Sequence, residues 1–355
     1  MITSAQTESV RALLEGKRRI VIFSHVAPDG DAMGSSLGLR HWLLSAYPQL
    51  DDVSVIVPTP QPPFLRWMPG SDDVFIHSVQ PEECRHVADN ADLCFLLDFN
   101  EPKRIEAAEP LLASLSCPKI LIDHHLHPDE SMADVIISYS AAPAASYLVL
   151  ELINSISQNS PLALSGERGR EQGACSLPLP VATCLYTGLM TDTGNFAFNS
   201  NDPELYMMIA ELLRAGINKD EIFDSVFNQF SVDRLRFTGY CIYHKMRIFP
   251  KYHAALIAIS REELKRFNFQ SGDAEGIVNM PLQIGPIKYS VFMREDVDKI
   301  KMSFRSQGDR PVNVFAHDIF NGGGHKNAAG GESYASLAEA VKLFEDNYQQ
   351  YFLKD

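Results

Sequence analysis

Residues 20–35 read IVIFSHVAPDGDAMGS, and this stretch decides the kind of fold that we expect. Its first five residues, Ile20–Ser24, form the short apolar run of a buried strand, and a helical pattern follows over Ala32–Tyr47. A turn containing Pro, Gly and Asp separates the two. A buried strand that leads through a polar turn into a helix is typical of a parallel sheet covered by helices.

The same alternation continues outward from this stretch. Further short apolar runs, each bounded by polar or turn residues, predict strands over Val53–Val57, Leu93–Leu97 and Ile120–Ile122. Helical patterns accompany them over Pro81–Ala88, Pro102–Leu115, Ala144–Ile156 and Leu179–Leu189. The first half of the chain is therefore predicted to be an α/β fold with a parallel sheet and helices on both faces.

The second half of the chain has a different pattern. Residues 203–246 predict successive helices, and later runs predict strands over Ala254–Ile259, Lys288–Met293 and Lys299–Phe304 and a last helix over Leu337–Tyr348. We expect a catalytic domain over residues 1–200, a helical connector over 201–245 and a smaller α/β domain with a mixed sheet over 246–355. The segment Asn154–Leu177, rich in Ser, Gly, Gln and Glu, predicts an exposed loop or insertion.

Composition narrows the possible partners. The 355 residues carry a formal net charge of -14, which argues against a protein that neutralises many phosphates of a long nucleic acid. Short phosphorylated substrates are compatible with that charge. The 6 cysteines form no Cys-x-x-Cys pair, and no early apolar run is long enough for a signal peptide or a membrane span. We expect free, buried thiols and a soluble cytoplasmic protein without a membrane partner.

Three polar clusters follow predicted strands. His25, Asp29 and Asp31 follow the first strand, Asp98 follows Leu93–Leu97, and Asp123–His127 follows the next strand. Ligands of open α/β sheets bind beyond the carboxyl ends of the strands, so we expect these clusters at one edge of one sheet. Carboxylates suit hard divalent ions, and the added imidazoles favour Mn, Fe, Co or Zn over Mg or Ca.

Each cluster also has a plainer interpretation. Asp31 suits a helix N-cap, Asp98 suits a turn, and Asp192, between two threonines, suits a capping position at a helix end. Three histidines within Asp123–His127 fit a solvated loop less well, and we favour metal or phosphate binding there.

The order of the motifs resembles that of the DHH phosphoesterase superfamily. The motifs are His25-x3-Asp29-x-Asp31, then Asp98, then Asp123-His124-His125, then Thr191-Asp192-Thr193-Gly194. The run Phe320–Gly330, FNGGGHKNAAG, resembles the glycine-rich motif of the DHH-associated C-terminal domain, with Asn321 where relatives often have a first glycine. The overall likeness is to the oligoribonuclease and pAp-phosphatase type, whose substrates are short RNA oligonucleotides, pAp and linear dinucleotides such as pApA.

The resemblance implies a division of labour among the site residues. Two divalent ions are expected, usually Mn²⁺, with Mg²⁺ or Co²⁺ as alternatives, and a water shared by them attacks phosphorus. The ligands of the first ion would be His25 and Asp29, those of the second would be Asp31, His124 and Asp192, and Asp98 would bridge the two. His125 would face the substrate phosphate, and Asp123 would orient its neighbours. The substrate-binding residues of the second domain would be Arg305, Gly322, Gly323, Gly324 and His325.

Two other functions remain open at this point. The first is another activity of the same superfamily, exopolyphosphatase or inorganic pyrophosphatase. The second belongs to a different class, a catalytically silent nucleotide-binding sensor. The expected partners are short oligoribonucleotides or small phosphorylated nucleotides rather than long duplexes, and the expected assembly is a monomer or a homodimer.

Overall fold

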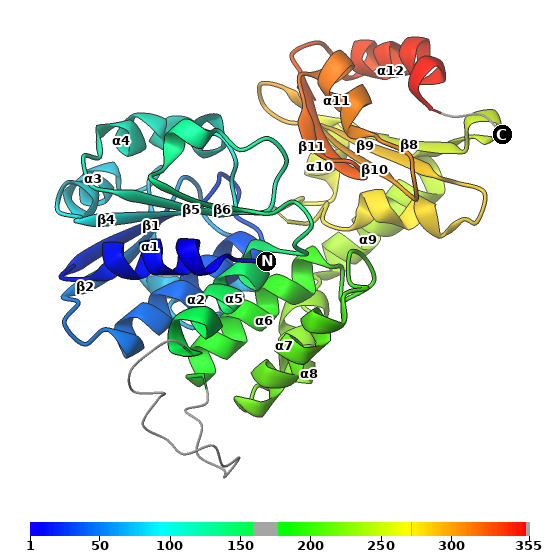
Figure 1. The fold of residues 1–355 in the computed structure, drawn as a ribbon. Helices are drawn as coiled ribbons and strands as arrows, with labels where there is room; N and C mark the ends of the chain where they lie inside the picture. The colour runs from blue at the N-terminus through cyan, green and yellow to red at the C-terminus, as the bar shows by residue number, and fades with distance from the viewer. Residues whose placement is uncertain (159–176, 271, 353–355) are drawn as a thin grey trace. The chain divides into compact units, whose positions relative to one another are not determined.

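The computed structural model describes residues 1–158, 177–270 and 272–352 (Figure 1). The chain divides into two compact units, Met1–Asn228 and Gln229–Asp355, and each contains a six-stranded sheet. The predicted α/β class, with a parallel sheet first and a mixed sheet second, is confirmed. Within the described residues, no helix is long and apolar enough to cross a membrane. The cysteines described, Cys84, Cys94, Cys117, Cys184 and Cys241, are free thiols.

The sheet of the first unit is entirely parallel and has the strand order β3-β2-β1-β4-β5-β6. Its strands are β1 (Arg19–Phe23), β2 (Asp52–Val57), β3 (Phe75–Ile76), β4 (Leu93–Leu97), β5 (Lys119–Asp123) and β6 (Val135–Ser138). The four central strands match the predicted apolar runs. The sequence analysis missed β3 and β6, because a strand of 2 or 4 half-buried residues leaves almost no hydrophobic pattern.

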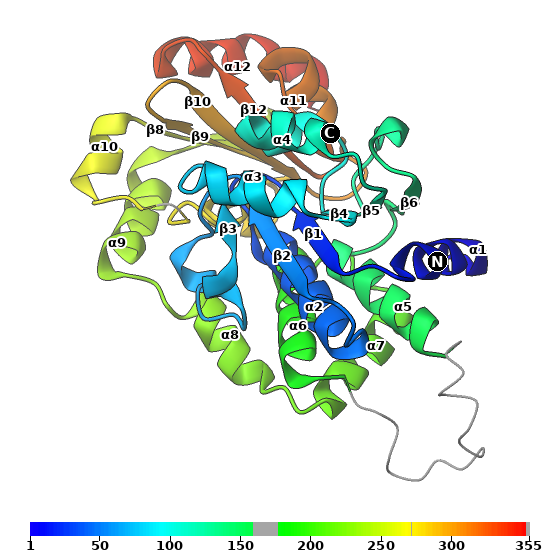
Figure 2. The ribbon, with the colours of Figure 1, turned by 90° about the vertical axis from the view of Figure 1, so that its left-hand side faces the viewer.

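Helices cover both faces of this sheet (Figures 1 and 2). The helices of the unit are α1 (Ser4–Leu14), α2 (Gly30–Ala46), α3 (Pro81–Asp89), α4 (Glu109–Ser114), α5 (Ala145–Gln158), α6 (Leu179–Asp192), α7 (Pro203–Arg214) and α8 (Lys219–Phe227). Along β1, Ile20 and Ile22 pack into the core shared with α1, α2, α5 and α6, whereas Val21 and Phe23 pack into the core shared with α3 and α4. The run is apolar throughout because alternate side chains enter different cores.

Three glycines of α2, spaced four residues apart, allow α6 to approach closely. A Cβ atom on Gly30 would lie 2.2 Å from Thr191 Oγ1, one on Gly34 would lie 2.6 Å from the Cys184 carbonyl, and one on Gly38 would lie 2.6 Å from a Leu185 methyl group. Residues that are four apart lie on one helix face, so the face of α2 toward α6 has no side chains at these three positions. This close packing fixes the end of α6 beside the start of α2.

Two predictions about this unit were wrong in part. The predicted helix over Pro102–Leu115 is a 3-10 helix, η3 (Pro102–Ala108), followed by α4, because Glu106 has a φ of 43° that an α-helix cannot contain. The first residues of the predicted insertion, Asn154–Gln158, belong to α5. Residues 159–176, the rest of that insertion, lie outside the described residues.

The second unit has the strand order β11-β12-β10-β9-β8-β7, antiparallel except for the parallel pair β8 and β9. Its strands are β7 (Met246–Phe249), β8 (Ala254–Ile259), β9 (Tyr289–Glu295), β10 (Ile300–Ser306), β11 (Gly323–His325) and β12 (Ala328–Ser333). Its helices are α9 (Val232–Tyr240), the π-helix η5 (Cys241–Lys245), α10 (Arg261–Arg266), the 3-10 helix η7 (Ile277–Gln283), α11 (Asn313–Phe320) and α12 (Leu337–Tyr351). Side chains of α11 and α12 form one core against the sheet, and side chains of α9, α10 and η7 form another.

The helices predicted over residues 203–246 are present as α7, α8, α9 and η5. By their contacts, α7 and α8 belong to the first unit and α9 belongs to the second. The three-part division into residues 1–200, 201–245 and 246–355 stays a prediction.

Candidate metal centre and substrate-binding residues

The strand order of the first sheet brings the polar clusters together. β4 lies between β1 and β5, and all three strands run in the same direction, so their carboxyl ends are neighbours. His25 follows β1, Asp98 follows β4, and Asp123 is the last residue of β5. The loop after β1 leads directly into α2, as Figure 2 shows. The expected common edge is therefore present in the structure.

A first group of metal-ligand atoms is formed by His25, Asp29 and Asp98. The Nε2 atom of His25 lies 3.5 Å from Asp98 Oδ2 and 3.9 Å from Asp29 Oδ1. On the other side of the ring, Nδ1 lies 2.8 Å from the carbonyl oxygen of Val26. A ring whose Nδ1–H donates to a carbonyl presents a lone pair on Nε2, which is the common arrangement of a metal-ligating histidine.

A second group is formed by Asp31, His124 and Asp192. The Nε2 atom of His124 lies 3.5 Å from Asp192 Oδ2 and 3.8 Å from Asp31 Oδ2. It also lies 3.4 Å from Asp98 Oδ1, so Asp98, a member of the first group, also adjoins the second. The Nδ1 atom of His124 lies 3.2 Å from the Ala142 carbonyl, which again directs Nε2 toward the carboxylates.

The helix cap at the start of α2 differs from the plain interpretation given above. Asp29, not Asp31, is the N-cap, and its Oδ1 accepts from the amides of Asp31 and Ala32 at 3.0 and 3.1 Å. Asp31 is 1% exposed and accepts from two backbone amides near the start of α5, those of Ala145 at 2.6 Å and Ser146 at 2.9 Å. These backbone donors hold each carboxylate in one orientation.

Asp98 shows most directly that the residues fit a metal ion. The side chain is 2% exposed, and its Oδ1 atom has no hydrogen-bond partner among the described residues. Its backbone has a φ of 65°, which aspartate tolerates better than most residues. A buried carboxylate oxygen without a partner is costly, and a cation between the two groups removes that cost.

The charges of the site act strongly on one another. Burial, together with the Asp98 charge, raises the pKa of Asp31 to about 7. Burial also raises the pKa of Asp192 well above its usual range. Although burial opposes its ionisation, the neighbouring imidazoles of His124 and His25 hold the pKa of Asp98 well below its usual range. Carboxylates packed this densely resist ionising together without a cation, which is the electrostatic signature expected of a metal centre.

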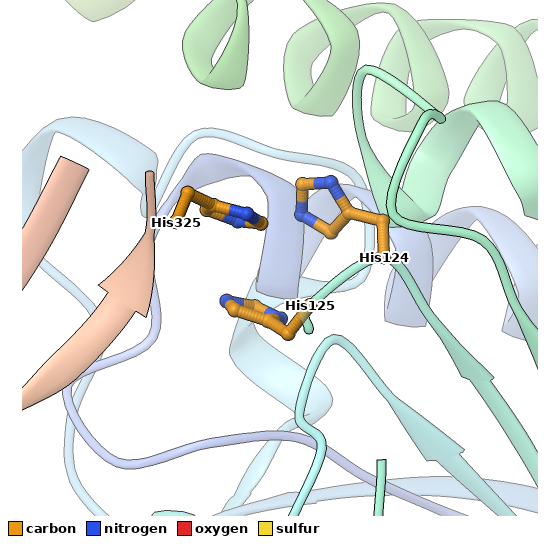
Figure 3. A group of neighbouring side chains, drawn as sticks. All are labelled: His124, His125 and His325. Atoms are coloured by element: carbon orange, nitrogen blue, oxygen red, sulfur yellow. The ribbon is translucent and has the colours of Figure 1, made fainter. Parts of the chain in front are cut away.

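His125 lies beside His124 on the segment that follows β5, as Figure 3 shows. The two ring centroids are 5.0 Å apart. Asp123, which is fully buried, accepts from His125 through both oxygens, from Nδ1 at 2.7 Å and from the backbone amide at 3.0 Å. Asp123 therefore fixes the orientation and the tautomer of the His125 ring.

In the second unit, Arg305 and His325 lie in one row of the sheet. Arg305 of β10 and His325 of β11 both pair with Ala328 of the intervening strand β12. Directly paired residues point to the same face, so the two side chains share a face with only a methyl group between them. Two strand spacings separate their backbones, about 10 Å. Phe304, the neighbour of Arg305, points into the core on the opposite face.

The glycine-rich run is part of a β-hairpin rather than a flexible loop. Asn321 ends α11 in the left-handed region, with a φ of 47°, a conformation that asparagine adopts more readily than other non-glycine residues. A Cβ on Gly322 would lie 2.0 Å from the Gly330 carbonyl, and Gly324 has a φ of 134°. A Cβ on Gly323 would meet no atom within 4 Å. Packing therefore requires two of the glycines and leaves Gly323 unexplained.

The sequence analysis missed the backbone groups that support the site. The carbonyl of Ala142 and the amides of Ala145 and Ser146 hold His124 and Asp31 in place. They belong to the small-residue run AAPAAS over residues 141–146, which leads into α5. That run was the available signal, since small residues at a helix start allow a buried carboxylate to reach the amides.

Comparisons with known proteins place the chain in a family. The model of the DHH family N-terminal domain matches residues 19–189, and the model of the DHHA1 domain matches residues 251–351. A bifunctional oligoribonuclease and PAP phosphatase NrnA of Bacillus subtilis is 26% identical over 328 residues, covering 92% of this chain and 93% of that protein. The protein of the same name from Thermus thermophilus is 30% identical over 335 residues, covering 91% and 89%.

A solved structure agrees with these matches. The exopolyphosphatase-related protein from Bacteroides fragilis has a TM-score of 0.88 and 42% sequence identity, and covers 99% of this chain and 97% of its own. The resemblance drawn from the motifs is thus confirmed over both units of the chain. This protein belongs to the DHH family and carries a DHHA1 domain in its second half.

Proposed function

We propose that this chain is a metal-dependent hydrolase that cleaves short oligoribonucleotides and linear dinucleotides such as pApA and removes phosphate from pAp. Two relatives that match nearly the whole chain carry the name oligoribonuclease and PAP phosphatase, which supports this substrate class. The observation that carries the proposal is the pair of three-residue ligand groups with the unpartnered Asp98 Oδ1 next to both.

In this proposal two divalent ions occupy the first unit, and Mn²⁺ is the ion that we favour. His25 and Asp29 would hold one, Asp31, His124 and Asp192 would hold the other, and Asp98, which lies within reach of both groups, would be shared. The mixture of carboxylates and imidazoles supports Mn²⁺ over Mg²⁺, with Co²⁺ as an alternative. When bound, such ions polarise phosphoryl oxygens and acidify water.

The side chains around the ions have separate tasks. Asp123 holds the His125 ring through two hydrogen bonds, so that His125 Nε2 is the atom available to a phosphoryl oxygen. Backbone amides at the start of α5 donate to both oxygens of Asp31 and fix its orientation. Because these groups are positioned before substrate arrives, little reorganisation is needed during the reaction.

The second unit supplies substrate binding. Arg305 and His325, in one row of the sheet, offer a guanidinium and an imidazole to a nucleotide phosphate, and the open backbone at Gly323 allows a ligand to approach closely. Gly322 and Gly324 act by shaping the hairpin. The net charge of -14 supports short substrates, since a long nucleic acid requires many cationic contacts.

A second candidate is hydrolysis of polyphosphate or pyrophosphate. The solved relative at 42% identity is named an exopolyphosphatase-related protein, which supports keeping this alternative. A catalytically silent nucleotide sensor is the alternative of another class. A cytoplasmic location, a monomeric or homodimeric state and the three-part domain division remain parts of the proposal.

The test is a substrate panel with the purified full chain and added Mn²⁺, Mg²⁺ or Co²⁺. The panel contains pAp, pApA, RNA of two to ten nucleotides, cyclic dinucleotides, polyphosphate and pyrophosphate. We expect turnover of pAp, pApA and the shortest RNA, highest with Mn²⁺. Turnover of polyphosphate or pyrophosphate alone would replace the proposal with the second candidate. Nucleotide binding without turnover of any substrate would favour the sensor.

A further inference from the structure

We propose that Arg104 is a substrate-binding residue of the first unit and that its guanidinium holds the phosphoryl group at the metal centre. This inference rests on the proposed function, because it assigns a residue to the same site. The chemical class of the ligand is a phosphate monoester or diester oxygen, common to all the proposed substrates.

The backbone places Arg104 between the two loops that carry the candidate ligands. Its carbonyl accepts from the amide of Val26, the residue after His25, at 2.9 Å. Earlier in the same segment, the Asn100 side chain donates to the carbonyl of Leu126, in the loop after His124 and His125, at 2.8 Å. The segment from residue 100 to residue 104 is therefore fixed against both loops at the carboxyl edge of the sheet.

The side chain of Arg104 is half-buried and unusual in its partners. Its Nε atom is buried without a hydrogen-bond partner, and across the described residues the guanidinium forms no ion pair. Lys103, the preceding residue in the chain, behaves as a surface cation normally does: its side chain is 74% exposed and its Nζ lies 2.8 Å from Glu101. Ile105 is fully buried and anchors the segment on the other side. Of these two neighbouring cations, Lys103 is exposed and paired, whereas Arg104 is partly buried and unpaired.

The backbone holds Arg104 beside the first group of ligand atoms, because its carbonyl accepts from the amide of Val26, the neighbour of His25. An arginine that is partly desolvated usually has a carboxylate partner. Among the described residues no carboxylate pairs with Arg104, which leaves its donors for another anion.

A phosphoryl group matches those donors. Guanidinium presents its N–H groups in a planar fork that suits phosphate oxygens bidentately, and it keeps its charge at every working pH. The competing explanation is packing, in which the aliphatic stem of Arg104 covers apolar surface and the charge is incidental. The two explanations differ in what happens when the charge is removed but the stem is kept.

The experiment compares Arg104→Met with Arg104→Lys, and Lys103→Met serves as the matched control. Each variant is assayed on pAp and pApA, and binding of Mn²⁺ and of inorganic phosphate to the Mn²⁺-loaded protein is measured by calorimetry. We expect Arg104→Met to lower kcat/KM by about 100-fold on both substrates and to weaken phosphate binding by a similar factor. Arg104→Lys should recover part of both losses, and Lys103→Met should match the wild type. Mn²⁺ affinity and the midpoint of thermal unfolding should be unchanged throughout.

Two results would overturn the inference. The first is Arg104→Met with wild-type phosphate binding, or with losses that accompany reduced Mn²⁺ affinity or earlier unfolding, which would make Arg104 a structural residue. The second is a loss on only one of the two substrates, because a contact to the reacting phosphoryl group serves both. If the wild type turned over neither substrate, the proposed function would fail, and phosphate binding to wild type and Arg104→Met would still decide the role of Arg104.

Discussion

The centre of the first unit's candidate site and the candidate residues of the second unit differ in burial. In the first unit Asp31, Asp98 and His124 are 1%, 2% and 4% exposed, and only Asp29 and Asp192 at its rim are exposed. In the second unit Arg305 and His325 are only half-buried and extend from one face of a sheet, His325 on the edge strand β11 and Arg305 two strands further in, on β10. The first arrangement suits a chemical step that is the same for every substrate. The second suits ligands that differ in length and base, because exposed long side chains adapt at low cost.

The largest expected effect comes from removing the charge of Asp98, the buried carboxylate at the centre of the candidate metal site. Asp98→Asn should lower kcat on pAp by at least about 10³-fold, because a neutral amide replaces the carboxylate that lies within reach of both ligand groups. The measurement is steady-state hydrolysis with Mn²⁺, with metal content determined in parallel. Asp129→Asn, at an exposed cap of the neighbouring loop, is the control. Full activity in Asp98→Asn would contradict the two-metal proposal.

The next effect tests how the buried site is supported. Gly34→Ala should cost about 3 kcal/mol of unfolding free energy, because its Cβ would lie 2.6 Å from a backbone carbonyl of α6. It should also lower activity, since α6 carries Asp192. The measurement is urea unfolding together with an assay at a temperature where the variant is folded. Gly239→Ala, in helix α9 with no atom within 4 Å of its Cβ, should be neutral or stabilising. Equal stability of the two variants would disprove the packing argument.

Substitutions at the half-buried candidate residues of the second unit should have smaller effects on activity. His325→Ala should raise KM for pAp about tenfold and leave kcat nearly unchanged, because a charged or hydrogen-bonded contact to phosphate contributes to binding. Gly322→Ala should be more damaging to folding than Gly323→Ala, since only the former has no room for a Cβ. Steady-state kinetics and thermal unfolding separate the two effects. A fall in kcat without a change in KM for His325→Ala would move this residue into the chemical step.

The smallest effect concerns the stability of the second unit. Glu263 accepts from Tyr240 and from Lys245, and although burial opposes ionisation, these partners with the Ser260 amide hold its pKa at about 2. A lowered folded pKa stabilises the fold above the ordinary glutamate pKa of 4.5, and this stabilisation is lost as the pH falls toward 2. Glu263→Gln should therefore cost about 1 kcal/mol at pH 7 and less at pH 3. Urea midpoints at both pH values, with Glu262→Gln as the control, measure it. An equal cost at pH 3 would contradict the ionic explanation.

The sequence alone predicted much of the fold and the candidate site. The four inner strands of the first sheet and β8, β9 and β10 of the second were found because they are apolar runs, such as Leu93–Leu97, bounded by turns. Short edge strands such as β3 and β11 were missed, since their residues are partly exposed and pair on one side only. The inner strand β12 was missed as well, because its alanines and glycines leave no apolar run. The helix expected over Pro102–Leu115 was interrupted at Glu106, a backbone feature that periodicity does not register.

For the site, the chain determined which residue types follow which strands, and the order of those motifs was enough to identify the family. The tertiary structure decided how the residues are arranged, because contacts across the chain have no local pattern. Asp192 reaches the other ligands only because the glycine face of α2 lets α6 lie against it. Asp31 is held by amides more than 110 residues away, and Arg305 and His325 share a row only because β12 lies between β10 and β11. The unpaired charge of Arg104 is likewise visible only once its surroundings are folded.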